Sequence, residues 1–144
     1  MIWRTVTLGT VGLTAGILGL WVAQREPPVR ILRATVLTPQ VPPGGQLRIE
    51  YDVERVKSCG LRVDRLFYDK DRVRKPLEPL EWNVDPGRIG RDTLRVVVDV
   101  PRSFAEGRAI YRTIARYECN LVHRLWPIIP PSRDIEFEVK GAPV

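Results

Sequence analysis

Leu47-Arg48-Ile49-Glu50-Tyr51-Asp52-Val53 alternates apolar with polar residues, as a strand with one buried face does. The same alternation recurs in Leu94–Val100, in Ala109–Cys119 and in Ile135–Val139. No window beyond residue 28 keeps the 3.6-residue period of an amphipathic helix for long. These four runs therefore predict half-buried strands.

Turn signals separate the alternating runs and leave room for three more short strands. The turns are Pro42-Pro43-Gly44-Gly45, Asp85-Pro86-Gly87 and Glu106-Gly107. The additional candidate strands are Ile31–Leu37, Leu61–Tyr68 and Leu80–Val84. About seven short strands in residues 29–144 predict an all-β domain of two packed sheets.

The two cysteines, Cys59 and Cys119, are far apart in sequence and lack the paired spacing of zinc or redox sites. A disulfide is the simplest interpretation, and it requires an oxidising compartment. The alternative is two separate buried thiols in a reducing compartment.

Ala115-Arg116-Tyr117-Glu118-Cys119 resembles the A-x-Y-x-C ending of the sixth strand in immunoglobulin-like domains. The resemblance implies an immunoglobulin-like sandwich. Cys59 and Trp82 depart from the family pattern, because Cys59 follows the second strand and Trp82 comes too late to be the packing tryptophan of the third. The usual bridge between sheets is therefore not implied. In that topology the third and sixth strands are neighbours, so we expect the two cysteines to meet within one sheet.

The N-terminal stretch Thr5–Ala23 contains no charged residue, and at about 1.5 Å per residue its helix would cross a hydrocarbon core. It predicts a transmembrane anchor over residues 1–24, followed by a proline-containing linker over 25–28. A cleavable signal peptide is the competing interpretation. Trp21 at the −3 position of a cut after Ala23 makes a poor cleavage site.

The orientation of this anchor rests on two conflicting signals. Arg25, Arg30 and Arg33 follow the stretch, and the positive-inside rule would place the domain in the cytoplasm. The expected disulfide favours the other side. We predict a single-pass protein of the cell (inner) membrane with its domain on the periplasmic or extracellular side.

Four glycines, Gly9, Gly12, Gly16 and Gly19, fall on one face of the N-terminal helix. Such a row lets another helix approach closely, so it predicts packing against another membrane protein or a second copy. The alternative is that glycine is simply common in membrane helices.

The sequence contains no catalytic motif. His123 is its single histidine, and no phosphate-binding loop, nucleophile elbow or carboxylate pair is present. The net charge of +6 comes from cations scattered singly along the chain, which argues against a nucleic-acid surface. We therefore predict no enzymatic activity, cofactor, metal, small-molecule substrate or nucleic-acid partner.

The segment 120–131 is apolar and contains three prolines. One interpretation is a loop that folds back to fill the open end of the core. The other is a contact loop for a partner or membrane, formed by Leu125, Trp126, Ile128 and Ile129.

Together these features predict a membrane-anchored interaction or structural module without enzymatic activity. An accessory subunit of an envelope complex, or an envelope protein encoded by a phage or prophage, would fit. The alternative is an extracytoplasmic adhesion or ligand-binding receptor domain, and an enzyme or metal carrier around His123 ranks last.

Overall fold

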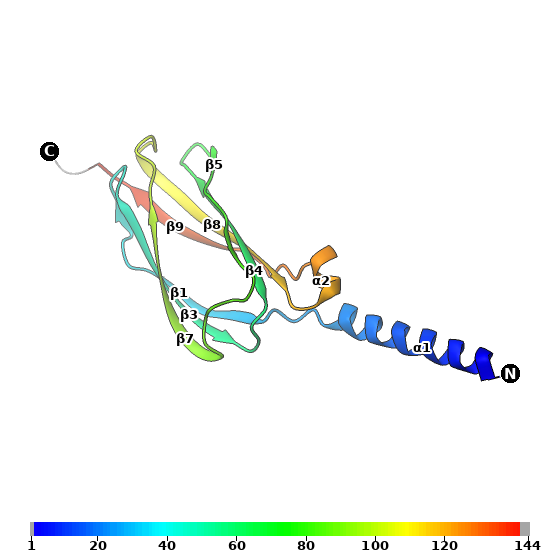
Figure 1. Ribbon diagram of the computed structural model, residues 1–144. Coiled ribbons are helices and arrows are strands. Elements are labelled where there is room, and N and C mark those ends of the chain that lie inside the picture. The colour runs from blue at the N-terminus through cyan, green and yellow to red at the C-terminus, as the bar shows by residue number, and fades with distance from the viewer. Residues whose placement is uncertain (1, 142–144) are drawn as a thin grey trace.

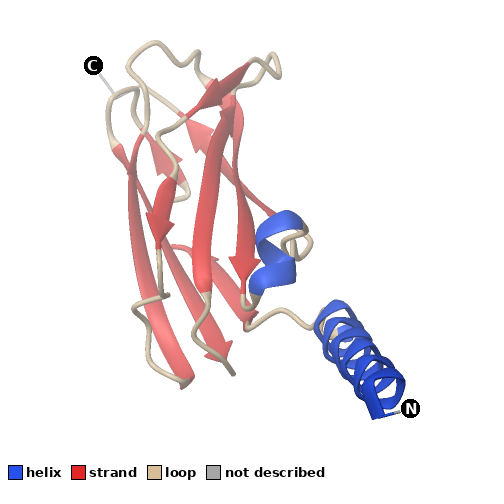
Figure 2. Ribbon diagram, turned by 45° about the vertical axis from the view of Figure 1, so that its right-hand side comes forward, coloured by secondary structure: helices blue, strands red, loops and turns tan. Residues whose placement is uncertain are grey.

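The computed structural model describes residues 2–141. Helix α1 (Ile2–Ala23) projects from one end of a body made of strands, and the short helix α2 (Leu121–Leu125) lies at that same end (Figures 1 and 2). The strands of the described chain are β1 (Val29–Val36), β2 (Gln40–Val41), β3 (Gln46–Arg55), β4 (Gly60–Tyr68), β5 (Arg74–Pro76), β6 (Leu80–Trp82), β7 (Gly90–Asp99), β8 (Gly107–Glu118) and β9 (Arg133–Val139).

The strands form two sheets. The smaller sheet has the order β1-β3-β7, and both of its pairings are antiparallel. The larger sheet has the order β2-β9-β8-β4-β5, and β2 pairs with β9 in parallel. Strand β6 pairs with the start of β4, and strand β5 pairs with the end of β4. Strands β5 and β6 therefore form one edge of the larger sheet, with a gap between them.

The core lies between the two sheets and extends from the loop after β7 to Val53, near the α1 end of β3. Alternate residues of β3 are buried, as the alternation of its sequence requires. Side chains from both sheets, and from the loop after β7, meet there. The buried members of this cluster are Val41, Leu47, Ile49, Tyr51, Val53, Phe67, Val98, Val100, Phe104, Ala109, Tyr111, Ile135, Phe137 and Val139.

Phe67 is the centre of the aromatic part of this core. Its ring centroid lies 5.4 Å from that of Phe104, 5.2 Å from that of Tyr111 and 5.8 Å from that of Phe137. Edge and tilted contacts of this kind stabilise beyond the area they bury, by about 1 kcal/mol each. The cluster fills the space between the sheets at this level.

The two flanks of the body differ. On one flank β1 and β9 approach each other, and Nη2 of Arg133 donates a hydrogen bond to the carbonyl oxygen of Ile31 at 3.0 Å. On the other flank the edge strand β7 faces the interrupted edge of β5 and β6 across an opening of about 570 Å³. We call this opening the inter-sheet groove. Its inner walls include Val63, Ala115 and Leu94.

A buried ion pair closes the end of the inter-sheet groove nearest α1. Nε of Arg55 lies 2.8 Å from Oδ2 of Asp85, and the two side chains are only 3% and 5% exposed. Nη1 of Arg55 also donates to the carbonyl oxygen of Arg88 at 2.9 Å. Gly87 lies against the guanidinium, where a Cβ atom would collide with it. The Asp85-Pro86-Gly87 turn is thereby tied to the end of β3.

The structure joins Cys59 and Cys119 in a disulfide, with their Cα atoms 4.6 Å apart. Cys59 precedes β4 and Cys119 follows β8, which are antiparallel neighbours paired at Gly60 and Glu118. The bridge therefore lies at the end of one sheet rather than between the sheets.

The predicted fold class is wrong. An all-β immunoglobulin-like sandwich of about seven strands behind a membrane helix does not describe a chain with nine described strands, a parallel pair and a second helix. The extra strands β2 and β5 span only two and three residues, so their sequences show no alternation. Strand β6 lies within the predicted strand Leu80–Val84. Helix α2 is likewise too short to show a helical period.

The predicted transmembrane anchor over residues 1–24 is also corrected. Among the residues that the structure describes, no helix is both long and apolar enough to span a membrane. The predicted location at the cell (inner) membrane, with the domain on the periplasmic or extracellular side, loses its basis with the anchor.

Breaking the disulfide should destabilise the body strongly. The bridge closes a loop of 60 residues, for which chain entropy gives roughly 4 kcal/mol. We expect the double variant Cys59→Ser, Cys119→Ser to lose an amount of this order in urea unfolding. A change below about 1 kcal/mol would show that the pairing of β4 with β8 holds this end without it.

The buried ion pair gives a second prediction, with a surface pair on the same strand as its control. Asp85→Asn leaves the Arg55 charge buried without its partner, which should cost roughly 3 to 5 kcal/mol of unfolding free energy. Glu54→Gln breaks an exposed pair with Arg91 and should cost less than about 1 kcal/mol. Equal effects in denaturant unfolding would contradict this account.

Candidate functional site

The short helix α2 owes its position to the residue that precedes it, Asn120. Its backbone is extended, and its side-chain oxygen accepts the amide hydrogen of His123 at 3.0 Å, as an N-cap does. His123 is fully buried, and its Nδ1 accepts the amide hydrogen of Cys119 at 3.3 Å. The histidine thus ties α2 to the disulfide end of β8.

Polar contacts join α2 to the end of α1. Nδ2 of Asn120 donates to the carbonyl oxygen of Trp21 at 3.4 Å. Nη1 of Arg25 donates to the carbonyl oxygen of Trp126 at 2.9 Å, and its guanidinium carbon lies 3.7 Å from the centre of the Trp126 ring. Stacking of a cation on an indole face adds about 1 kcal/mol at exposed sites. These contacts fix where α1 leaves the body.

The predicted contact residues divide into two groups. Leu125 is 92% exposed and Trp126 58% exposed, and Ile129 is exposed as well. Ile128 instead is buried and exchanges backbone hydrogen bonds with Tyr117 at 2.9 and 3.0 Å. The segment therefore folds back through Ile128 and presents its other apolar side chains outward.

Leu121 adds to the exposed group, although it is not among the predicted contact residues. It lies at the first position of α2 and is also exposed. We call Leu121, Leu125, Trp126 and Ile129 the α2 surface. The turn of helix around His123 is what brings Leu121 and Leu125 out, since residues four apart share one helix face.

The row of Gly9, Gly12, Gly16 and Gly19 lies on α1 without any covering group, as no described atom lies within 4 Å of a Cβ built there. Apolar side chains of α1, such as Val11 and Leu13, are also exposed. The apolar surface of α1 therefore continues toward the α2 surface with no other part of the described chain over it.

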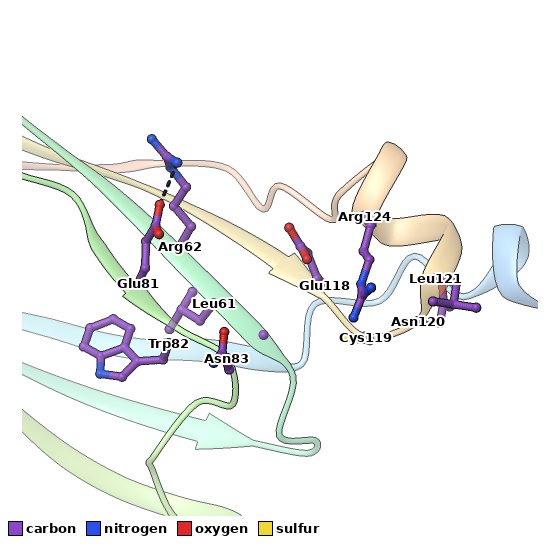
Figure 3. A pocket seen from close by; sticks show the side chains of 11 residues that line it. Leu61, Arg62, Glu81, Trp82, Asn83, Glu118, Cys119, Asn120, Leu121 and Arg124 are labelled. Atoms are coloured by element: carbon purple, nitrogen blue, oxygen red, sulfur yellow. Dashed lines mark hydrogen bonds and ion pairs between the residues drawn. The ribbon is translucent and has the colours of Figure 1, made fainter.

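A polar pocket of about 560 Å³ lies between the disulfide end of β8, α2 and β6 (Figure 3). One wall carries the ion pair of Arg62 with Glu81, in which Nη1 lies 2.6 Å from Oε1. Glu118 and Arg124 also line it. Histidine and serine are absent from its described lining, so the pocket offers carboxylates and guanidinium groups but no imidazole or serine hydroxyl. Across the described residues, no group of three His, Cys, Asp or Glu side chains could hold a metal ion.

Folding gathers cations at the opposite end of the body, which we call the basic end. The side chain of Lys70 lies against Gly107, and Nζ of Lys75 donates to Oγ of Ser103 at 2.7 Å, so the turn after β4 is beside the loop before β8. The exposed cations there are Lys70, Arg72, Arg74, Arg102 and Arg108, and within the described chain none of them forms an ion pair. Lys70, Arg72 and Arg74 are already close in sequence, and the fold places Arg102 and Arg108 at the same end. The exposed carboxylates of Asp71, Asp99 and Glu106 also lie there.

Comparisons with known proteins show likeness at the level of fold alone. No protein-family model matches the chain, and no curated protein matches it. A solved structure of the alkylpurine DNA glycosylase AlkC from Pseudomonas fluorescens, bound to DNA containing an abasic-site analogue, is similar with a TM-score of 0.50 at 13% identity. The likeness covers 81% of this chain and 31% of that protein, so this chain corresponds to about a third of it.

This likeness corrects two predictions. The absence of enzymatic activity cannot be inferred from this architecture, because a similar fold occurs within an enzyme. The exclusion of nucleic acid as a partner fails in the same way, since that enzyme was solved on DNA. The spacing of cations along the sequence also does not predict whether they form a nucleic-acid surface, because it does not show which strand ends meet in the fold.

Proposed function

We propose that this chain is a protein-interaction module that binds a partner protein through the α2 surface and the adjoining apolar surface of α1. The observation that carries the proposal is the continuous exposure of apolar side chains at one end of the body. Leu125, Trp126 and Ile129 are exposed there. Ile128, which lies in the same segment, is buried. Apolar patches of this kind on proteins mark contact sites.

The chemistry of this end suits a protein partner. Trp126 offers a large rigid ring, and aromatic anchors of this type dominate binding energy at protein interfaces. Arg25 is stacked on that ring before any partner arrives, so the ring is already held in one orientation.

A photo-crosslinking experiment tests the proposal. A benzophenone amino acid placed at Leu125 should give a defined, stoichiometric protein adduct in producing cells. The same amino acid at Val97 is the control, because Val97 is an exposed apolar residue on the outer face of β7. The double variant Leu125→Ser, Trp126→Ser should lose the complex, with a change in unfolding free energy of no more than about 1 kcal/mol, from the lost stacking of Arg25 on Trp126. Retention of the complex by the double variant, or equal adducts from position 97, would contradict the proposal.

A second candidate function is nucleic-acid binding at the basic end. It is favoured by five exposed cations without ion-pair partners among the described residues, and the enzyme of similar fold was solved on DNA. Cations that contact phosphates make affinity fall with salt, by about 0.9 in log–log slope for each phosphate neutralised.

Fluorescence anisotropy on a labelled DNA duplex, repeated across a salt series, tests this candidate. The variant Arg72→Gln, Arg102→Gln should weaken binding and lower the salt slope by about one for each phosphate that is no longer neutralised. The variant Arg33→Gln, Arg124→Gln removes the same charge elsewhere. It should change the DNA affinity and the salt slope less than Arg72→Gln, Arg102→Gln does. Equal reductions in both variants would show only a response to net charge, and the candidate would be dropped.

A further inference from the structure

The inter-sheet groove exists because the inner faces of the two sheets carry short side chains toward α1. Phe67 pairs with Tyr111 across β4 and β8 in the filled half of the body. Two inward pairs further along, Val63 faces Ala115 on the same two strands. Replacing an aromatic pair by Val and Ala removes most of the volume that would close the sheets. The groove begins where this change occurs.

The lining of the groove is mainly apolar. Leu94 and Val96 contribute from β7, and Leu80 and Trp82 contribute from the segment at β6. These side chains are only partly buried in the protein alone. Contact with a second apolar body would remove them from water, at roughly 25 cal/mol for each Å² covered.

One inner position of β4 breaks the apolar pattern. Every second residue of β4 points inward, and the apolar ones are Leu61, Val63 and Phe67. Arg65 occupies the inward position between Val63 and Phe67. Its Nε and Nη2 donate to the carbonyl oxygen of Glu78 at 3.1 and 2.7 Å. Among the described residues no carboxylate lies within ion-pair distance of Arg65. A guanidinium without a countercharge thus lines an apolar groove.

The other charged groups of the groove are already paired. Arg55 and Asp85 neutralise each other at the end near α1. Nε of Arg95, at the rim, lies 2.9 Å from Oε2 of Glu50. The positive charge of Arg65 is therefore the unbalanced charge of the described lining, and it favours an anion.

Tyrosine hydroxyls stand close to this guanidinium. Burial raises the pKa of Tyr111 above its ordinary value, and the nearby guanidinium of Arg65 opposes this rise. Burial also raises the pKa of Tyr51, whose ring lines the same groove. Both hydroxyls remain protonated at neutral pH and are available as hydrogen-bond donors.

We propose that the inter-sheet groove binds an elongated aliphatic molecule with one anionic head group. The head group would lie at Arg65 and the Tyr111 hydroxyl, and the aliphatic chain would run along Val63, Ala115, Leu94 and Val96. The volume of about 570 Å³ lies within the range of small-molecule sites, roughly 300 to 1,000 Å³.

A peptide strand fits this groove less well. It could pair with the free edge of β7 on one side only. Its remaining backbone N–H and C=O groups would face apolar walls without partners, which is unfavourable. A saturated chain has no such groups.

Isothermal titration calorimetry with the full chain and a series of carboxylates tests the proposal. Octanoate, nonanoate and decanoate, each kept below its micelle concentration, should bind with affinity rising about fourfold for each methylene. Decyltrimethylammonium, which has the same tail and the opposite charge, should bind at least tenfold more weakly than decanoate. Equal affinities for the two decyl ions would overturn the assignment of Arg65.

Variants locate the binding. Ala115→Phe fills the groove and should abolish decanoate binding, while Ile114→Phe, the next residue on the opposite face of β8, should leave it unchanged. Arg65→Met should remove the preference for decanoate over decyltrimethylammonium. Arg48→Met, which removes an exposed arginine from the outer face of β3, should preserve that preference. Val96→Gln, at the half-exposed rim, weakens binding and provides a second groove variant if Ala115→Phe does not fold.

Two results would overturn the proposal. The first is decanoate affinity that stays within twofold in the groove variants but falls in Leu13→Ser, which would place the ligand on α1. The second is a dimer, detected by sedimentation, that Ala115→Phe abolishes in a chain that binds no carboxylate. That result would make a second copy of the chain the occupant of the groove.

Discussion

The packing of aromatic rings around Phe67 sets the distance between the two sheets, and most other features follow from it. Phe104 reaches this cluster from the loop after β7, so the aromatic contacts also hold the end of the smaller sheet in place. Beyond the rings, the inward pair of Val63 and Ala115 leaves space between the sheets, and Tyr51 and Tyr117 line that space. The flank closed by Arg133 and the flank left open at β7 are consequences of where this filling stops.

At the other end of the body, order depends on polar contacts. The disulfide joins the ends of β4 and β8, and Asn120 and His123 then turn the chain into α2. Because this turn is tied at both of its ends, Leu125 and Trp126 are presented on a fixed framework rather than on a loose loop. An apolar surface held in this way loses little conformational entropy when it binds.

The sequence predicted the parts of the fold that depend on regular alternation. The runs beginning at Leu47, Leu94, Ala109 and Ile135 coincide with β3, β7, β8 and β9, and Cys59 and Cys119 pair within one sheet. Strands β2 and β5 and helix α2 could not be predicted, because two to five residues carry no period. Their positions depend on contacts with residues distant in sequence, such as the capping of α2 beside Cys119.

The candidate site was predicted only in part, for a similar reason. Trp126 and Leu125 were found because an apolar segment is visible in any sequence, but the burial of Ile128 depends on its pairing with Tyr117. The sequence contained a sign that Arg65 is a candidate functional residue, because Arg65 interrupts an inward row of apolar residues on β4. That signal was readable only once the register of β4 was known. The basic end required the fold itself, because its cations come from separate loops.

The length of the body has a consequence for how its two ends act. The α2 surface and the basic end lie at opposite ends of the strands (Figure 1). Strand β3, with 10 residues, spans roughly 33 Å at about 3.3 Å per residue. At physiological ionic strength charges are screened beyond about 8 Å, so neither end senses the charge of the other. A partner bound at one end would therefore leave the charge and the surface of the other end unchanged.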